Sequence, residues 1–206
     1  MAQNYQLILD KTIEQITLSE QKPRLLLQCC CAPCSSYVLE YLSEFFDITL
    51  FFYNPNMSSD AEYDKRAKEL VRLVGEMGLV GCKIQIEPYN PQEFFEIAKG
   101  KEMLAEGGER CFACYRLRLE KTAKKAKEEN FDYFCTTLSI SPHKRADKLN
   151  EIGGELSEIF GVKYLYSDFK KNNGYIRSIE LSKKFDLYRQ NFCGCVYSKK
   201  QSESRN

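Results

Sequence analysis

The sequence has few of the features that would assign its class at once. No run of about 18 apolar residues occurs, and residues 1–20 hold no uninterrupted apolar stretch, so we expect neither a membrane span nor a signal peptide. Charge of one sign is also missing, because 30 basic residues stand against 29 acidic ones. Because these charges balance, the net charge of the chain does not favour binding to nucleic acid. The single histidine, His143, is given no role. We expect a cytoplasmic protein in a reducing compartment.

A glycine-rich phosphate-binding turn is absent as well. The apolar run at residues 24–28 is predicted to be the first strand of a sheet, and thiols rather than glycines follow it. In an enzyme of this architecture that binds phosphate, a glycine-rich turn would occupy this place. The missing glycines argue against ATP binding, and they indicate a turn built to hold something that sulfur binds.

Cysteine is abundant instead. The chain has ten cysteines, and all except Cys82 and Cys135 fall into three tight groups. In a reducing compartment such groups bind a metal ion, hold an iron–sulfur cluster or cycle through disulfides, whereas a secreted disulfide framework is normally shorter and richer in loops. The groups are Cys29-Cys30-Cys31-Ala32-Pro33-Cys34, Cys111-Phe112-Ala113-Cys114 and Cys193-Gly194-Cys195.

Strand and helix patterns alternate along the chain. This alternation with short links predicts an α/β fold of three layers, in which a parallel sheet is covered by helices on both faces, as in Rossmann-like domains. Ligands of such sheets bind at the carboxyl ends of the strands, where the first cysteine group is expected. We expect one domain, 1–206, with a frayed polar tail at 198–206. The predicted strands are 24–28, 48–53, 83–87, 133–137 and 163–166, and the predicted helices are 5–16, 34–46, 63–77, 91–98, 111–129, 141–160 and 179–188.

The second cysteine group favours a shared four-sulfur site. Cys111 and Cys114 are three residues apart at the start of a predicted helix, so both sulfurs point the same way near N–H groups that favour thiolates. Together with the first group they can supply four thiolates, as an iron–sulfur cluster requires. A structural zinc ion and a thioredoxin-like dithiol stay as alternatives.

The third group suggests redox chemistry. A disulfide between Cys193 and Cys195 would close a small strained ring and would be easily reduced, while Gly194 relieves part of the backbone strain. A pair of ligands for a second metal is the alternative. Basic residues outnumber acidic ones in residues 110–125 and 169–200, which flank cysteine groups. These stretches fit RNA phosphate contacts or solvated helix faces equally well.

Five blocks of sequence make the chain resemble the QueH family of epoxyqueuosine reductases. Together they span roughly residues 24–198 and are highly specific. The blocks are Cys30-Cys31-Ala32-Pro33-Cys34, Phe52-Tyr53-Asn54-Pro55-Asn56, Cys111-Phe112-Ala113-Cys114-Tyr115-Arg116-Leu117-Arg118-Leu119, Thr136-Thr137-Leu138-Ser139-Ile140-Ser141-Pro142 and Leu187-Tyr188-Arg189-Gln190-Asn191-Phe192-Cys193-Gly194-Cys195.

The resemblance implies an adenine-nucleotide hydrolase-like fold and the reduction of epoxyqueuosine in tRNA to queuosine, without cobalamin or ATP. It implies a [4Fe–4S] cluster, with Cys29 or Cys34 as alternative ligands, and an additional iron. The expected cluster ligands are Cys30, Cys31, Cys111 and Cys114, and the expected redox pair is Cys193 and Cys195. Candidate ligands of the additional iron are Cys34, Cys195 and Asp168. Candidate tRNA contacts are Arg116, Arg118, Lys183, Lys184 and Arg189.

Two other classes of protein are consistent with parts of the sequence. One is a zinc-stabilised RNA-binding or tRNA-modifying protein without redox chemistry, and the other is a thiolation-type enzyme that uses ATP. The electron donor and the oligomeric state have no signature in the sequence.

Overall fold

The computed structural model describes residues 3–19 and 21–203. Its five strands form one sheet in the order β3-β2-β1-β4-β5, and all four neighbouring pairs are parallel, which confirms the predicted α/β class. The first strand lies in the middle, so the chain builds the sheet outward in two directions from β1. The strands are β1 (Arg24–Gln28), β2 (Asp47–Phe52), β3 (Lys83–Ile86), β4 (Tyr133–Thr136) and β5 (Lys163–Tyr164).

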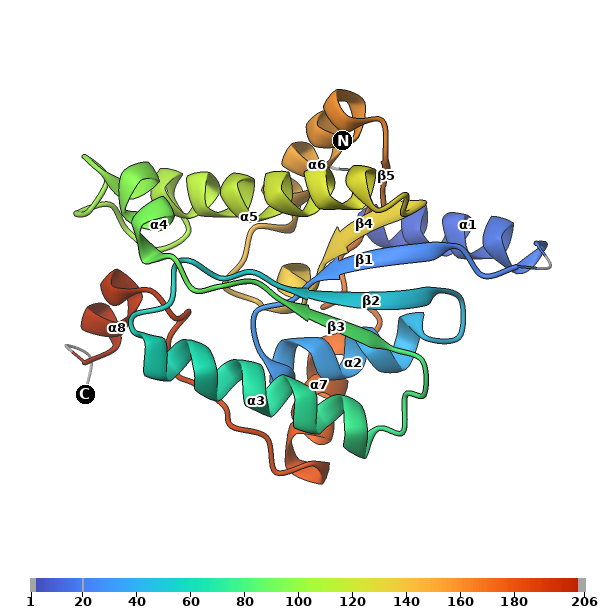
Figure 1. Cartoon of the computed structure of the whole chain (residues 1–206), viewed down its shortest axis with the longest axis horizontal. Coiled ribbons are helices and arrows are strands. Elements are labelled where there is room, and N and C mark those ends of the chain that lie inside the picture. Colours follow the sequence, from blue (N-terminus) through green and yellow to red (C-terminus); the bar gives the residue numbers. More distant parts are fainter. Residues whose placement is uncertain (1–2, 20, 204–206) are drawn as a thin grey trace.

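Helices cover both faces of this sheet (Figure 1). Helices α5 and α6 lie over one face, and α2, α3 and α7 lie under the other. No helix in residues 3–19 and 21–203 is both long and apolar enough to cross a lipid bilayer. The helices are α1 (Tyr5–Thr17), α2 (Ala32–Leu42), α3 (Asp60–Glu76), α4 (Pro91–Ala98), α5 (Glu109–Glu128), α6 (Ala146–Phe160), α7 (Gly174–Lys184) and α8 (Val196–Glu203).

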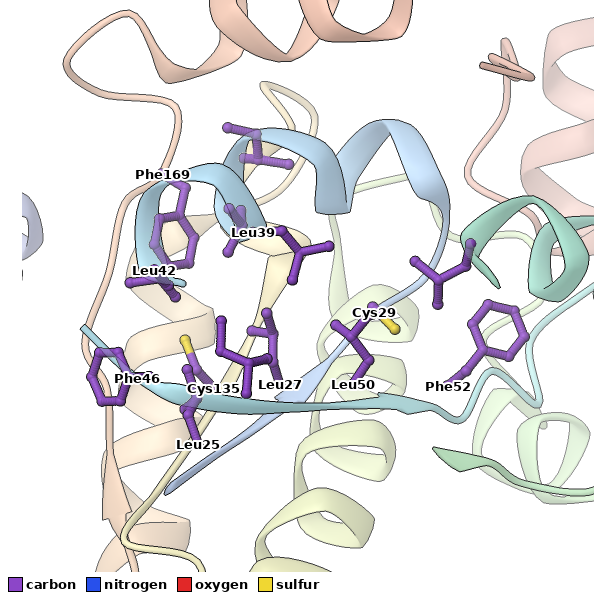
Figure 2. Close-up of a cluster of buried hydrophobic side chains, with 14 of the residues drawn as sticks. Leu25, Leu27, Cys29, Leu39, Leu42, Phe46, Leu50, Phe52, Cys135 and Phe169 are labelled. Atoms are coloured by element: carbon purple, nitrogen blue, oxygen red, sulfur yellow. The ribbon is translucent and has the colours of Figure 1, made fainter. Parts of the chain in front are cut away.

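Side chains of β1 pack alternately into two hydrophobic cores, one on each face of the sheet. Leu25 and Leu27 pack on the side of α2 and α3, whereas Leu26 packs on the side of α5 and α6, because successive side chains of a strand point to opposite faces. All three leucines are fully buried. The alternation continues past the strand, so Cys29 joins the core with Leu27, as Figure 2 shows, while Cys30 faces the other core.

Several boundaries differ from the expected ones. Strand β5 ends at Tyr164, and the segment after β4 first forms a short 3₁₀ helix, η1 (Thr137–Ile140), before α6 begins at Ala146. Helix α7 begins at Gly174 and ends at Lys184. Part of the expected tail is helical in α8, where Ser198 is buried, and residues 204–206 lie outside the described part of the chain.

The three cysteine groups lie at the carboxyl ends of the strands. In Figure 1 these ends point to the left, toward the start of α5 and toward α8. The chain leaves β1 through Cys29–Cys31 into α2, and η1 follows β4 at the same edge. The fold therefore positions a site at this edge, as expected for a parallel sheet.

Candidate metal and thiol site

The first cysteine group forms a compact cluster of sulfurs. The Sγ atoms of Cys30, Cys31 and Cys34 all lie within 4.8 Å of one another, and the Cys30 and Cys31 sulfurs are 3.6 Å apart. Cys31 caps helix α2 in an extended conformation and Pro33 occupies its first turn, so the helix start fixes Cys34 beside the other two. This is a group of thiols that could hold a metal ion.

Negative charge in this group concentrates on Cys31. Hydrogen bonding with Cys30 and Cys34 lowers the pKa of the Cys31 thiol well below its ordinary value, and the cation of Arg66 acts in the same direction. The hydrogen bond with Cys31 raises the pKa of Cys30 to about 12. The Arg66 side chain is only 1% exposed, so water barely screens its charge. The cluster is thus prepared to bind a cation through a thiolate.

The second group lies at the start of α5. Cys111 accepts a hydrogen bond of 3.3 Å from the Gly107 N–H group, and Cys114 is buried. Burial raises the pKa of the Cys114 thiol, while the nearby cation of Arg118 opposes the shift. Arg118 also interacts electrostatically with Cys30, so one buried guanidinium serves both cysteine groups.

The third group is a tight loop held from two sides. Gly194 has a φ of +126°, and a Cβ there would lie 2.8 Å from the Met57 sulfur, so the position requires glycine. Arg66 Nη1 donates to the Cys193 carbonyl at 3.2 Å, and the Ser198 N–H group donates to Cys195 Sγ at 3.4 Å. Burial raises the pKa of Cys195 to about 11. All ten cysteines are free thiols.

Two adjoining cavities connect these groups. The larger has a volume of about 280 Å³, and the thiols in its wall are those of Cys30, Cys31, Cys34 and Cys193. The smaller, of about 10 Å³, has Cys111, Cys114, Cys193 and Cys195 in its wall. Arg118, Lys144 and Cys193 line both cavities, so the three cysteine groups lie around two neighbouring spaces.

Some expected site residues lie elsewhere. Asp168, expected as an iron ligand, pairs with Lys170 at 2.5 Å and is not in the wall of either cavity. Arg118, expected to contact tRNA, is 1% exposed, lines both cavities and interacts electrostatically with Cys114 and Cys193. Arg116 is partly exposed and pairs with Glu155. Lys183 and Lys184 are exposed in the last turn of α7, and Arg189 is exposed in the wall of the larger cavity.

Three charged residues of the site were not predicted from the sequence. Arg66, Glu106 and Lys144 all line the larger cavity. Arg66 could have been found, because it shares the buried stripe of α3 with Tyr63 and Leu70 at helical spacing. Glu106 and Lys144 lie outside the helices and strands and carry no such periodic signal.

The donor set fits an iron–sulfur group by its chemistry. Thiolates are the ligands of such clusters, and buried cations beside them offset their negative charge. The Tyr115 hydroxyl and both amide atoms of Asn56 are buried without a hydrogen-bond partner among the described residues, and both side chains line the smaller cavity. Buried polar groups normally have partners, so these groups are placed to contact an occupant of that cavity.

Fold and site together define an α/β protein with a thiol-rich centre at the carboxyl edge of its sheet. The model of the family described as "Epoxyqueuosine reductase QueH" matches residues 25–201. Proteins of that name are similar over most of their length: 43% identity in Streptococcus pyogenes serotype M1 (96% of this chain, 78% of the relative), 44% in Staphylococcus epidermidis (95% and 84%) and 34% in Thermotoga maritima (84% and 89%). The chain belongs to the QueH family of epoxyqueuosine reductases, which are oxidoreductases.

Proposed function

We propose that this protein reduces epoxyqueuosine at the wobble position of a tRNA to queuosine, by removing the epoxide oxygen with two electrons. Family membership supports the reaction. The observation that carries the proposal is the convergence of three cysteine groups on two adjoining cavities. A tRNA substrate places the reaction in the cytoplasm.

The proposed ligands of a [4Fe–4S] cluster are Cys30, Cys31, Cys111 and Cys114. Such a cluster, when bound, supplies electrons one at a time at the wall of the larger cavity. Cys34 is the alternative ligand, since its sulfur lies beside those of Cys30 and Cys31, and it is also a candidate for an additional iron together with Cys195. Cys29 is not proposed as a ligand, because its side chain lies in the hydrophobic core.

Cys193 and Cys195 are proposed as the redox pair of the protein. Their oxidation to a disulfide releases two electrons and two protons, which is what the conversion of an epoxide to an alkene and water consumes. Both thiols face the smaller cavity, and Cys193 also faces the larger one. Cys193 thus adjoins both the cavity that Cys111 and Cys114 line and the larger cavity proposed for the substrate. A donor of electrons then restores the two thiols.

The larger cavity is the proposed binding site of the modified base. Its volume of about 280 Å³ is of the order of one nucleobase with its substituent, and the aromatic rings of Phe192 and Tyr175 lie in its wall. RNA-modifying enzymes commonly take an unstacked loop base against aromatic side chains. Arg189, exposed at this wall, is placed to contact the adjoining phosphates.

The test is an anaerobic comparison of wild-type protein with Cys193→Ser and Cys82→Ser. Cys82 lines neither cavity, so it is the matched control. We expect wild type and Cys82→Ser to contain iron and sulfide and to convert epoxyqueuosine tRNA. Cys193→Ser keeps the visible cluster spectrum and loses turnover. Loss of the spectrum in Cys193→Ser would make Cys193 a ligand, and a colourless wild type with one zinc would favour the zinc protein without redox chemistry.

A further inference from the structure

Lys144 is a buried ammonium that faces the substrate cavity. Its side chain is 6% exposed and lines both cavities. The backbone fixes it there, because its N–H group donates to the Ser141 carbonyl at 3.1 Å in the turn after η1. Burying an ammonium is costly unless it is paired, so its partners indicate what it is for.

Those partners link the lysine to the redox loop. Lys144 Nζ lies 3.2 Å from Glu106 Oε1, and the ammonium also interacts electrostatically with Cys193. The Ser198 hydroxyl donates to Glu106 Oε2 at 3.1 Å and accepts from the Cys193 N–H group at 2.9 Å. The ammonium is therefore connected to the backbone of Cys193 through Glu106 and Ser198.

The charges around the ammonium keep the lysine protonated. Burial alone would lower the pKa of Lys144, but its interactions with Cys193, Tyr115 and Glu106 outweigh burial and raise the pKa well above the ordinary value. Burial would raise the pKa of Glu106, but Lys144 and Ser198 lower it. At neutral pH the Glu106 carboxylate thus orients the Lys144 ammonium.

Other cationic groups in the larger cavity are less suited to release a proton. The guanidinium groups of Arg66, Arg118 and Arg189 are not deprotonated in proteins, whereas a lysine ammonium can give up one of its three protons. His143 is exposed rather than enclosed beside the thiols. Lys144 is the buried amine among the described residues of this wall.

We propose that Lys144 donates a proton to the epoxide oxygen of the substrate, with Glu106 and Ser198 as positioning residues. This inference rests on the proposed function. The Cys193 and Cys195 thiols become a disulfide and supply the two electrons, the two C–O bonds break, and a C=C bond forms. The oxygen takes one proton from Lys144 Nζ as the first C–O bond breaks, takes a second from solvent and leaves as water. Of the two protons that the thiols release, one restores Lys144 and the other returns to solvent. An alkoxide is far more basic than an amine, so the first transfer is downhill.

The experiment measures one turnover of pre-reduced, iron-loaded protein with epoxyqueuosine tRNA, with tRNA affinity and the visible spectrum recorded for each variant. Lys144→Ala should slow the single turnover by about 10²- to 10⁴-fold without changing affinity or spectrum. Lys144→Arg should be similarly slow, because guanidinium keeps the charge but withholds the proton. Added methylammonium should accelerate Lys144→Ala. The matched control is Lys148→Ala, which removes a partly exposed lysine paired with Glu151.

Three results would overturn the proposal: an unslowed Lys144→Ala, a Lys144→Arg near the wild-type rate, or a slow Lys144→Ala that methylammonium leaves unchanged. If the Lys144 variants do not fold, Glu106→Gln takes their place, and we expect about 10²-fold slowing from the misplaced ammonium. An unchanged rate there would equally overturn it. Failure of the proposed function itself would be distinct, because wild-type protein would then convert no tRNA.

Discussion

Arg66 Nη1 lies 3.2 Å from the carbonyl oxygen of Cys193, although 127 positions separate the two residues in the chain. The same guanidinium pairs with Glu62 at 2.6 Å and interacts electrostatically with Cys31. Helix α3 therefore attaches the third cysteine group to the first. The Arg66 guanidinium also lies 5.4 Å from the Phe192 ring, so it contacts two successive residues of the loop.

Replacing Arg66 should destabilise the protein more than replacing its neighbour on α3. Arg66→Met leaves Glu62 without its cation in a site that is 13% exposed, so we expect a loss of about 3 kcal/mol in the free energy of unfolding. Arg72 also pairs with carboxylates and reaches a later segment, donating to the Phe185 carbonyl at 3.0 Å, but it is 37% exposed. Arg72→Met should cost about 1 kcal/mol or less.

Urea unfolding of the metal-free, reduced proteins measures both losses. The loop should also become accessible in Arg66→Met, so alkylation of Cys193 should accelerate in this variant and not in Arg72→Met. Equal losses of stability, together with unchanged alkylation, would show that Arg66 does not hold the loop.

Buried thiols outside the site should make the fold sensitive to alkaline pH. Cys135 is fully buried in the core, where Figure 2 shows it, and its thiol donates to the Leu165 carbonyl at 3.2 Å. Burial raises its pKa to about 12. A raised pKa in the folded state gives stability that is complete below the unfolded pKa, about 8.5, and is lost as pH rises toward 12. Within that window, one such thiol lowers the free energy of unfolding by about 1.4 kcal/mol for each unit by which the pH rises.

The free energy of unfolding at pH 8, 9 and 10, measured in reductant, tests this contribution. Cys135→Ala should be less stable than wild type at pH 8 and should lose less stability between pH 9 and pH 10. The control is Val38→Ala, which removes a fully buried side chain without an ionisable group and should keep the wild-type slope. Identical slopes in wild type and Cys135→Ala would contradict the assignment.

The sequence was sufficient for the five strands of the sheet. The alternation in an extended segment explains why Cys29 enters one core while Cys30 turns to the other, but it does not explain Cys31, which lies in the same core as Cys30 because helix α2 begins there. The boundaries of the helices after β4 were harder to predict from the sequence. Ser141-Pro142 resembles a helix start, whereas α6 begins at Ala146 after a 3₁₀ turn.

Only some of the charged residues of the site could be predicted from the sequence. Arg118 lies four residues after Cys114 on α5, so helical periodicity places it toward the thiols, and its charge suggested a surface position instead. Lys144 and Glu106 come from separate irregular segments, and only the tertiary fold brings them within 3.2 Å. Sequence spacing has no information on such a pair.

Binding of tRNA should depend on the lysines at the end of α7. Lys183 and Lys184 are exposed in its last turn, and Arg189 follows them at the wall of the larger cavity. Each lost phosphate contact lowers the salt dependence of affinity by about one unit of the log–log slope. The double variant Lys183→Ala, Lys184→Ala should bind tRNA more weakly, with a slope reduced by about two.

Two lysines near the carboxyl end of α5 provide a matched control. Lys124 and Lys127 are exposed near the carboxyl end of α5, whereas Cys111 and Cys114 lie at its start, so about two turns or more of helix separate them from the thiols. Lys124→Ala, Lys127→Ala removes the same charge. Filter binding across a series of salt concentrations compares the variants. If both pairs weaken binding equally, the effect is one of total charge, and α7 is not the tRNA contact.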